Sequence, residues 1–201
     1  MKAVPKATVN LWVVAIYTGM RHDELCALSW DDVDLKKGTI HIQQNINNYD
    51  QFGPPKTDAG IRTITLLKPA LDALQAQFSL TGEDDKTEVT FQHREYASTE
   101  LQKIRFVFRP LRNSKEPNPY YSKNALRYNW KVGIDKSGIR KRMPYQSRHT
   151  YACWALSAGA NPSFIATQMG HENVKMVYEI YSKWMSEKDK DEITMLNAKM
   201  L

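Results

Sequence analysis

The sequence predicts a mainly α fold with a small antiparallel β-sheet, in the α+β class. Several segments repeat apolar residues at helical spacing and begin at proline or end at glycine, whereas two short segments alternate polar and apolar residues. The chain has 201 residues, of which 42% are hydrophobic. This length suits one domain with a sizeable core, and no repeat, low-complexity tract or linker divides it. We therefore expect a single domain over residues 1–201.

Helices are expected both before and after the predicted strands in the sequence. The segment "TVNLWVVAIY", residues 8–17, is apolar and is followed by Gly19, a residue that commonly ends helices. Near the C-terminus, Val174, Val177 and Tyr181 recur at helical spacing within residues 173–184. The other expected helices cover residues 21–28, 69–78, 122–133, 145–159 and 162–170.

Two strands are expected in the first third of the chain. Residues 39–43 and 61–66 both alternate polar and apolar side chains, and the turn-rich stretch "FGPPKTDAG" separates them. This arrangement predicts a small antiparallel sheet. The segment "TELQKIRFVF", residues 99–108, is compatible with either a helix or a strand.

The charge distribution points to a polyanionic partner. The net charge is +6, but residues 100–150 alone contain 13 Lys or Arg and only 3 Asp or Glu, so the rest of the chain is slightly acidic. A basic segment on such a body is typical of proteins that bind nucleic acid. The alternative is a solvated basic surface without a dedicated ligand.

Several classes of protein are disfavoured. No apolar run approaches the roughly 20 residues of a membrane span, and the first ten residues lack the apolar stretch of a signal peptide. The two cysteines, Cys26 and Cys153, show no metal-binding spacing, which fits a reduced, cytoplasmic setting. No metal or cofactor is expected.

Four local patterns carry candidate chemistry. They are "TGMRHDELCALSWDDVDL" with Arg21, "PPKTDAGIRTITL" with Lys56, "YQSRHTYACWALSAGANPSFIATQMGHENV" with Arg148 and His171, and "MVYEIYSKW" with Tyr181. Singly each pattern is weak. In this order and at this spacing, over residues 7–184, the chain resembles the catalytic domain of tyrosine recombinases, the phage integrase family.

The resemblance implies a role for each matched residue. Arg21 and Arg148 match the two arginines that grip the scissile phosphate, and Lys56 matches the lysine that protonates the leaving 5′-oxygen. His171 matches a position that hydrogen-bonds the phosphate, and Tyr181 matches the nucleophile. The fold implied is that of the tyrosine recombinase catalytic domain.

One position departs from the family pattern. The family usually has a histidine three residues before the second arginine, and this chain has Tyr145 there. A phenol can donate a hydrogen bond, but with an ordinary pKa of about 10 it is a poor base near neutral pH. The group that removes the proton from Tyr181 is therefore not assigned by the resemblance.

The chemistry fits these residue types. Attack on a phosphodiester builds negative charge on the non-bridging oxygens, which two fixed guanidiniums can stabilise. A covalent nucleophile divides the reaction into two steps, and the alcohol-like leaving group needs a proton donor such as Lys56. With two arginines and a lysine supplying positive charge, the mechanism does not require a metal ion.

Each assignment has a plainer alternative. Arg21 could simply pair with Glu24 within its helix, which would buttress it in either case; Lys56 could be a solvated turn residue; and His171 could cap a helix. His149 points about 100° away from Arg148 on a helix and is expected to anchor the helix by a hydrogen bond. Tyr178 is the rival nucleophile, one helical turn before Tyr181. The remaining histidines, His22, His41 and His93, match no motif and are expected at the surface.

The resemblance implies a DNA strand-exchange enzyme that forms a 3′-phosphotyrosine and releases a 5′-hydroxyl, which then attacks a new partner. Double-stranded DNA is the expected partner, with the basic segment 103–142 holding the backbone, in a homotetramer on paired sites and a monomer without DNA. Two alternatives remain. One is a type IB topoisomerase, and the other is a non-catalytic DNA-binding module with the same fold.

The resemblance also bears on domain organisation. Family integrases usually carry an N-terminal DNA-binding region, whereas the catalytic block begins here near the first residue. The chain is therefore expected to be a catalytic domain taken from a longer integrase, or the product of a truncated gene. Residues 185–201, which end in a weakly apolar stretch, are expected to be exchanged between protomers.

Overall fold

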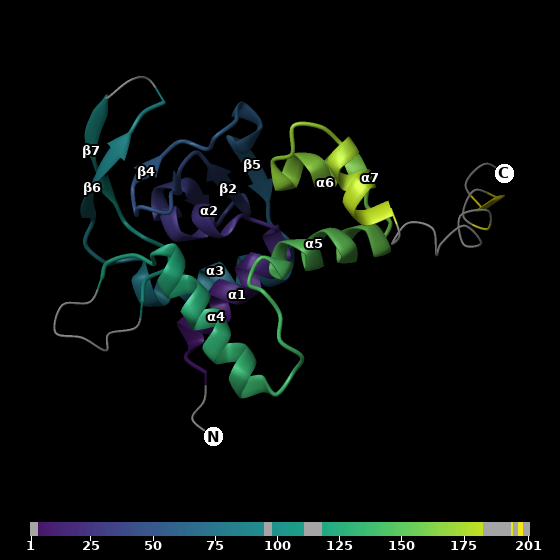
Figure 1. The fold of residues 1–201 in the computed structure, drawn as a ribbon, viewed down its shortest axis with the longest axis horizontal. Helices are drawn as coiled ribbons and strands as arrows, with labels where there is room; N and C mark the ends of the chain where they lie inside the picture. The colour runs from purple at the N-terminus through teal and green to yellow at the C-terminus, as the bar shows by residue number, and fades with distance from the viewer. Residues whose placement is uncertain (1–3, 95–97, 111–117, 183–193, 195–196, 199–201) are drawn as a thin grey trace.

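The computed structural model describes residues 4–94, 98–110, 118–182, 194 and 197–198. Its main helices are α1 (Lys6–Thr18), α2 (His22–Ala27), α3 (Lys68–Thr81), α4 (Lys123–Ser137), α5 (Gln146–Ser157), α6 (Pro162–Met169) and α7 (Lys175–Tyr181). Single 3-10 turns lie at Trp30–Asp32 and Asp58–Gly60. The strands lie on one side of the molecule, and α6 and α7 pack over α5 on the other (Figure 1). The mainly α prediction is confirmed.

The predicted antiparallel sheet is present. It contains β1 (Val33–Asp34), β2 (Thr39–Ile42) and β5 (Arg62–Thr65), in the order β1-β2-β5. Ile40 lies opposite Ile64 in the register of β2 and β5, and both side chains are fully buried. The alternation of isoleucine with polar residues therefore places one face of this sheet in the core.

A second sheet was not predicted. It contains β3 (Asn45–Ile46), β4 (Phe52–Gly53), β6 (Thr87–Gln92) and β7 (Thr99–Ile104), and β4 runs parallel to β6. Strands β3 and β4 have two residues each, too short to show a period. The undecided segment 99–108 forms β7 as far as Ile104, and Phe106 then pairs with Ser29 as an isolated bridge.

Several helix ends follow the sequence signals and others do not. Helix α3 continues to Thr81, beyond the expected end at residue 78. Gly19 ends α1 with a positive φ of 64°, and a Cβ there would lie 2.6 Å from the ring of Tyr151 on α5. Helix α6 begins at Pro162, where the side chain of Asn161 accepts from the backbone N–H of Ser163. Helix α4, by contrast, continues through Gly133 and ends at Gly138, which adopts the left-handed conformation. The expected helix end at residue 133 was therefore wrong.

The buried apolar side chains form two clusters. The larger one joins α1, α2, α3 and both sheets, and includes Leu11, Leu25 and Ile64. The smaller one joins α5, α6 and α7, and includes Ala152, Met169 and Tyr181. Residues 185–201, the segment expected to be exchanged between protomers, lie almost entirely outside the described residues. No helix within the described ranges is long and apolar enough to cross a membrane.

Candidate active site

Glu24 is the centre of a buried ion network between α2 and β5. Its side chain is 1% exposed and accepts from Nη1 and Nη2 of Arg62, each at 2.9 Å. It also accepts from the backbone N–H of Arg21 at 2.8 Å and from Nη1 of Arg21 at 2.9 Å. The expected pairing of Arg21 with Glu24 is therefore present, and Arg62 joins it. Because α2 is only six residues long, this network fixes its first turn to the sheet.

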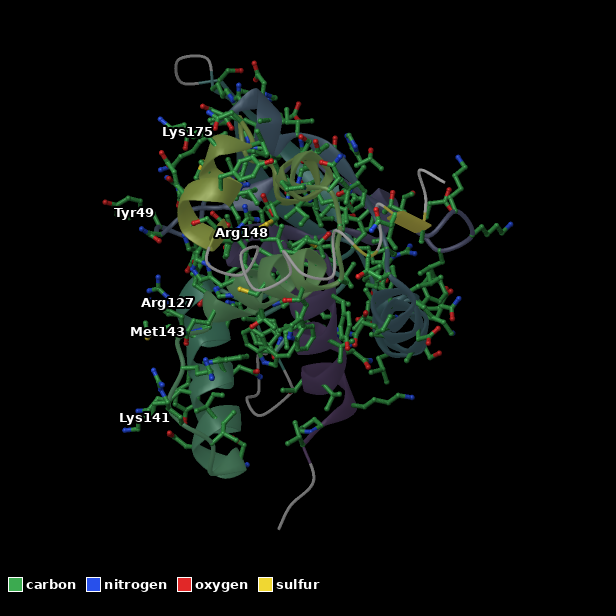
Figure 2. The ribbon with its side chains drawn as sticks, turned by 90° about the vertical axis from the view of Figure 1, so that its right-hand side faces the viewer. Tyr49, Arg127, Lys141, Met143, Arg148 and Lys175 are labelled. Carbon is green, nitrogen blue, oxygen red and sulfur yellow. The ribbon has the colours of Figure 1, made fainter. Side chains whose placement is uncertain are left out.

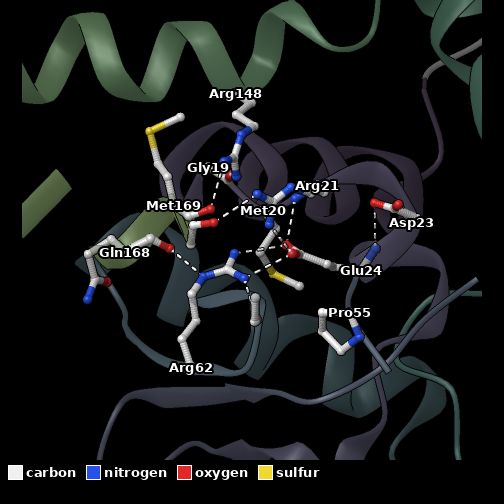
Figure 3. Close-up of polar contacts among 12 residues, drawn as sticks. Gly19, Met20, Arg21, Asp23, Glu24, Pro55, Arg62, Arg148, Gln168 and Met169 are labelled. Carbon is white, nitrogen blue, oxygen red and sulfur yellow. Dashed lines mark hydrogen bonds and ion pairs between the residues drawn. The ribbon is translucent and has the colours of Figure 1, made fainter. Parts of the chain in front are cut away.

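Three arginines donate to consecutive carbonyls at the end of α6. Arg62 Nε donates to the carbonyl of Gln168 at 2.8 Å, Arg148 Nη2 to that of Met169 at 2.6 Å, and Arg21 Nη2 to that of Gly170 at 2.9 Å. Figure 3 shows the three arginine side chains directed at the backbone around Gln168 and Met169. These hydrogen bonds hold together segments that are more than 100 residues apart in the sequence.

Arg148 is buried where α5 meets the end of α1. Its side chain is among the largest fully buried ones, and its Nη1 donates to the carbonyl of Gly19 at 2.6 Å. Burial, helped by the charge of Arg21, lowers the pKa of Arg148 to about 10, so it stays charged near neutral pH. The guanidinium of Arg148 thus binds two backbone carbonyls, those of Gly19 and Met169.

His171 follows the turn that the arginines hold. Burial and the charges of Arg148, Arg21 and Arg62 lower the pKa of His171 to about 4, so its imidazole is neutral near pH 7. Its Nδ1 is buried and has no hydrogen-bond partner in the part of the chain that the structure describes. The backbone N–H of His171 donates to the carbonyl of Ala166 at 2.9 Å. The main chain, and not the imidazole, therefore closes α6.

Tyr181 ends α7 in contact with His149 of α5. Its Oη lies 2.6 Å from His149 Nδ1, and the residue is 3% exposed. Burial raises the pKa of Tyr181 to about 12, against the opposing effect of the Arg148 charge. Tyr178, the rival nucleophile, is 45% exposed on the outer face of α7. Of the two tyrosines, only Tyr181 has its hydroxyl hydrogen-bonded to a described side chain of α5.

Tyr145 lies between two histidines. Its ring is edge-on to His149 with centroids 5.4 Å apart, and edge-on to His22 at 6.0 Å. His22 was expected at the surface, but it is half-buried, and its Nε2 lies 3.3 Å from Ser147 Oγ. Burial lowers the pKa of His22 to about 4. Helix α2 therefore packs against the start of α5, and His22 lies in this contact. The expected surface position of His22 was wrong.

Lys56 is exposed in the loop between β4 and β5. It borders a cavity of about 370 Å³ that is also lined by Asp23 and Lys123. Arg94 holds the loop by donating to the carbonyl of Pro55 and to Asp58. In the described parts of the chain no hydrogen bond or ion pair joins Lys56 to the arginine network. The structure thus groups Arg21, Arg148 and His171, places Tyr181 and Tyr145 beside them on either side of His149, and leaves Lys56 apart.

Exposed cations lie along α4 and the loop that follows. Arg127 and Lys131 are exposed one turn apart on α4, and Arg140 and Lys141 are exposed in the loop. Figure 2 shows Arg127 and Lys141 pointing outward from the same side of α4. The loop leads to Tyr145 at the start of α5.

Gly170 is required at the turn held by the arginines. Its φ is +67°, and a Cβ would lie 2.8 Å from Arg62 Nη1 and 2.9 Å from the carbonyl oxygen of Ala59. We expect Gly170→Ala to lower the free energy of unfolding by about 2–4 kcal/mol, since left-handed strain and overpacking add. Gly138→Ala is the control, because Gly138 has the same conformation with no atom within 4 Å. Denaturant unfolding measures both, and equal losses would contradict the role of close packing at Gly170.

Two residues of the site were missed or set aside by sequence reasoning. Arg62 belongs to the "KTDAGIR" pattern, but its burial depends on Glu24, 38 residues earlier. His149 was assigned a hydrogen bond that anchors the helix, and the structure gives it one with Tyr181 itself. The adjacent "RH" dipeptide was the available signal for His149. Its partner could not be read from the sequence because it depends on the packing of α7 against α5.

Comparisons with known proteins place the chain in a family. The profile of the phage integrase family matches residues 2–187. Prophage integrase IntR of Escherichia coli (strain K12) is 54% identical over 191 residues, which cover 95% of this chain and 46% of that protein. The chain therefore belongs to the phage integrase family, and it spans about half the length of the curated relatives that it matches.

Solved structures share the fold. The Tn1549 transposon integrase in complex with transposon right end DNA superposes with a TM-score of 0.69 at 20% identity, over 94% of this chain and 59% of that one. The XerA recombinase superposes with a TM-score of 0.59 at 19% identity, over 98% of this chain and 62% of that one. These likenesses confirm the tyrosine recombinase catalytic-domain fold.

Proposed function

We propose that this chain is the catalytic part of a site-specific DNA recombinase that cuts and rejoins strands through a 3′-phosphotyrosine. The observation that carries the proposal is the position of three sequence motifs: two meet at one turn, and the third lies on the helix that follows. Arg21 and Arg148 bind consecutive carbonyls of the segment that ends in His171, and Tyr181 lies on the helix that follows. The 54% identity to a prophage integrase supports the same activity.

Each residue has a role in this proposal. Arg21 and Arg148 stabilise the charge that builds on the non-bridging oxygens, and neutral His171 donates a hydrogen bond to one of them. Tyr181 Oη attacks phosphorus and the bond to the 5′-oxygen breaks, with Lys56 donating a proton to that oxygen. In the second step an incoming 5′-hydroxyl attacks the phosphotyrosine, and Tyr181 leaves.

Burial of Tyr181 and Arg148 adds a requirement. The residues are 3% and 1% exposed, so a phosphate cannot reach either side chain without a movement of the surrounding elements. Arg148 has five N–H donors, and two of its nitrogens already bind carbonyls. We propose that DNA binding opens a path to both side chains, with α5 and α7 keeping their contact, and brings Lys56 toward the arginines.

The proposed partner is double-stranded DNA. Several structural neighbours are integrases or recombinases in complex with DNA. Exposed cations along α4, including Arg127 and Lys131, would bind the duplex backbone, and such binding weakens steeply with salt. A homotetramer on paired sites, with residues 185–201 exchanged between protomers, completes the proposal.

Removing the Tyr181 hydroxyl should abolish covalent attachment to DNA. The measurement uses a library of nicked duplexes of randomised sequence, whose short 5′ fragment diffuses away after cleavage and traps the adduct. The chain is expected to give a covalent band on a denaturing gel, and Tyr181→Phe is expected to give none. Tyr178→Phe is the matched control, because Tyr178 is exposed on the same helix.

The other outcomes identify the competing functions. DNA binding without any covalent band would indicate a non-catalytic module. A band together with relaxation of supercoiled plasmid, and no strand exchange, would indicate a type IB topoisomerase. A band that is lost in Tyr178→Phe and kept in Tyr181→Phe would move the nucleophile by one helical turn.

A further inference from the structure

The proton that Tyr181 must lose has no acceptor assigned by the family pattern, because Tyr145 stands where the usual histidine would be. In the structure the Tyr181 hydroxyl is directed at His149, with Oη and Nδ1 2.6 Å apart. The ring of Tyr145 packs edge-on with that of His149, and no hydrogen bond joins Tyr145 to Tyr181 among the described residues. We infer that His149, through Nδ1, accepts the proton that Tyr181 loses as its oxygen attacks the scissile phosphorus.

The direction of this hydrogen bond follows from burial. Tyr181 is 3% exposed, and His149 is the one side chain among the described residues that is placed to accept from its hydroxyl. If His149 donated from Nδ1 instead, the phenolic hydrogen would be buried without an acceptor, at a cost. Nδ1 is therefore the acceptor, and the neutral ring carries its hydrogen on Nε2.

The surroundings keep His149 ready to accept. Burial, and then the charge of Arg148, lower the pKa of His149 below its ordinary value of 6.5, so the ring is neutral near pH 7. The other titratable groups that face the Tyr181 and His149 pair are Tyr145 and Cys153, and burial raises the pKa of the Cys153 thiol. A neutral imidazole in contact with the attacking oxygen is the arrangement that general base catalysis requires.

The proton balance closes over both steps, given the proposed function on which this inference rests. In cleavage the Tyr181 proton moves to His149 Nδ1, the O–P bond forms, and the 5′-oxygen leaves with a proton from Lys56. In rejoining, the incoming 5′-hydroxyl gives its proton to Lys56, and the imidazolium of His149 returns a proton to the departing Tyr181 oxygen. No further acid or base is needed.

The first test is the pH profile of cleavage by His149→Asn, on a duplex selected from the library. Asparagine places an acceptor oxygen near the position of Nδ1, so it keeps the hydrogen bond but cannot take the proton. We expect a loss of about 10²–10⁴-fold at pH 7. Between pH 7 and 9 the variant should recover about tenfold per unit, because the phenolate fraction of Tyr181 rises below its high pKa. The unaltered chain should stay nearly constant, since His149 is already neutral.

Controls separate proton transfer from positioning. His41→Asn is the matched control, because His41 is exposed on β2 and distant in the fold from α5. Tyr145→Phe removes the hydroxyl of the phenol whose ring packs edge-on with His149, and it should slow cleavage far less than His149→Asn. The inference is overturned if His149→Asn cleaves at the normal rate, if its loss is independent of pH, or if Tyr145→Phe has the larger effect.

The second test does not depend on activity, so it separates failure of this inference from failure of the proposed function. Nitrogen-15 NMR of the labelled chain near pH 7 should show His149 as the neutral Nε2–H tautomer, with an Nδ1 resonance that shifts in Tyr181→Phe. A protonated Nδ1 would overturn the inference even if the chain cleaves DNA. An Nε2–H tautomer in a chain that forms no adduct would support the hydrogen-bond arrangement and reject the proposed function instead.

Discussion

A Glu24→Gln variant should lose about 3–5 kcal/mol of unfolding free energy, because it leaves the Arg62 charge buried without a counterion. The Arg62 side chain is 4% exposed and donates two hydrogen bonds to the Glu24 carboxylate. Gln has the same shape but no charge, and it offers one acceptor oxygen where the carboxylate offers two. For a domain of this size the loss corresponds to a fall in melting temperature of roughly 6–20 °C.

The effect of Glu24→Gln should also depend on pH. Burial alone would raise the pKa of Glu24, but the hydrogen bonds and charge of Arg62, with the charge of Arg21, hold it below its ordinary value of 4.5. A depressed pKa stabilises the folded state above the unfolded pKa, and this contribution is lost as the pH falls through the folded pKa. The difference between the two proteins should therefore be constant above about pH 5 and shrink below 4.5.

An exposed ion pair provides the control for Glu24→Gln. Glu179 pairs with Lys175 at 3.4 Å on α7, with side chains 59% and 78% exposed. Glu179→Gln should change the free energy of unfolding by less than about 0.5 kcal/mol. Thermal and denaturant unfolding measure both variants, and a comparable small effect at Glu24 would show that the buried network contributes little.

Arg148→Lys should lower the rate of DNA cleavage by about 10²–10³-fold while retaining a positive charge. The guanidinium spans the carbonyls of Gly19 and Met169, which lie on different elements, and an ammonium on a flexible stem cannot hold the same planar fork. At least one buried carbonyl then loses its donor. We expect a further loss of about 2–3 kcal/mol in unfolding free energy.

Arg21→Lys separates the two effects of Arg148→Lys. The Arg21 side chain is 31% exposed, so water can replace a lost hydrogen bond there. Arg21→Lys should therefore slow cleavage to a similar degree with a smaller loss of stability. If Arg148→Lys cleaves DNA at the normal rate, the Arg148 guanidinium serves the fold alone.

The sequence predicted those parts of the fold that depend on local signals. Gly19 and Pro162 marked helix boundaries, and the alternation around Ile40 and Ile64 marked the antiparallel pair. The second sheet escaped prediction because β3 and β4 are two residues long and β4 pairs with a strand nearly 40 residues later. Their strand geometry comes from tertiary pairing and not from any periodic pattern.

The candidate site also combines features that local sequence predicts with features that depend on tertiary packing. Its residue types follow from motifs, and the structure groups Arg21, Arg148 and His171 as the motifs imply. Burial and hydrogen-bond partners depend on how α5, α6 and α7 pack against the first two helices, and no local pattern carries that information. For this reason the contact of His149 with Tyr181, and the enclosure of Arg148 by two carbonyls, emerge only in three dimensions.

The long sequence separation of the arginine contacts has a consequence during protein synthesis. Arg21 donates to a carbonyl 149 residues later, and Arg148 to one 129 residues earlier. A chain growing from its N-terminus can pair Glu24 with Arg62 early, yet it has neither the second arginine nor the tyrosine until the last helices have left the ribosome. A polypeptide that is interrupted before α7 would thus lack the nucleophile of the proposed reaction.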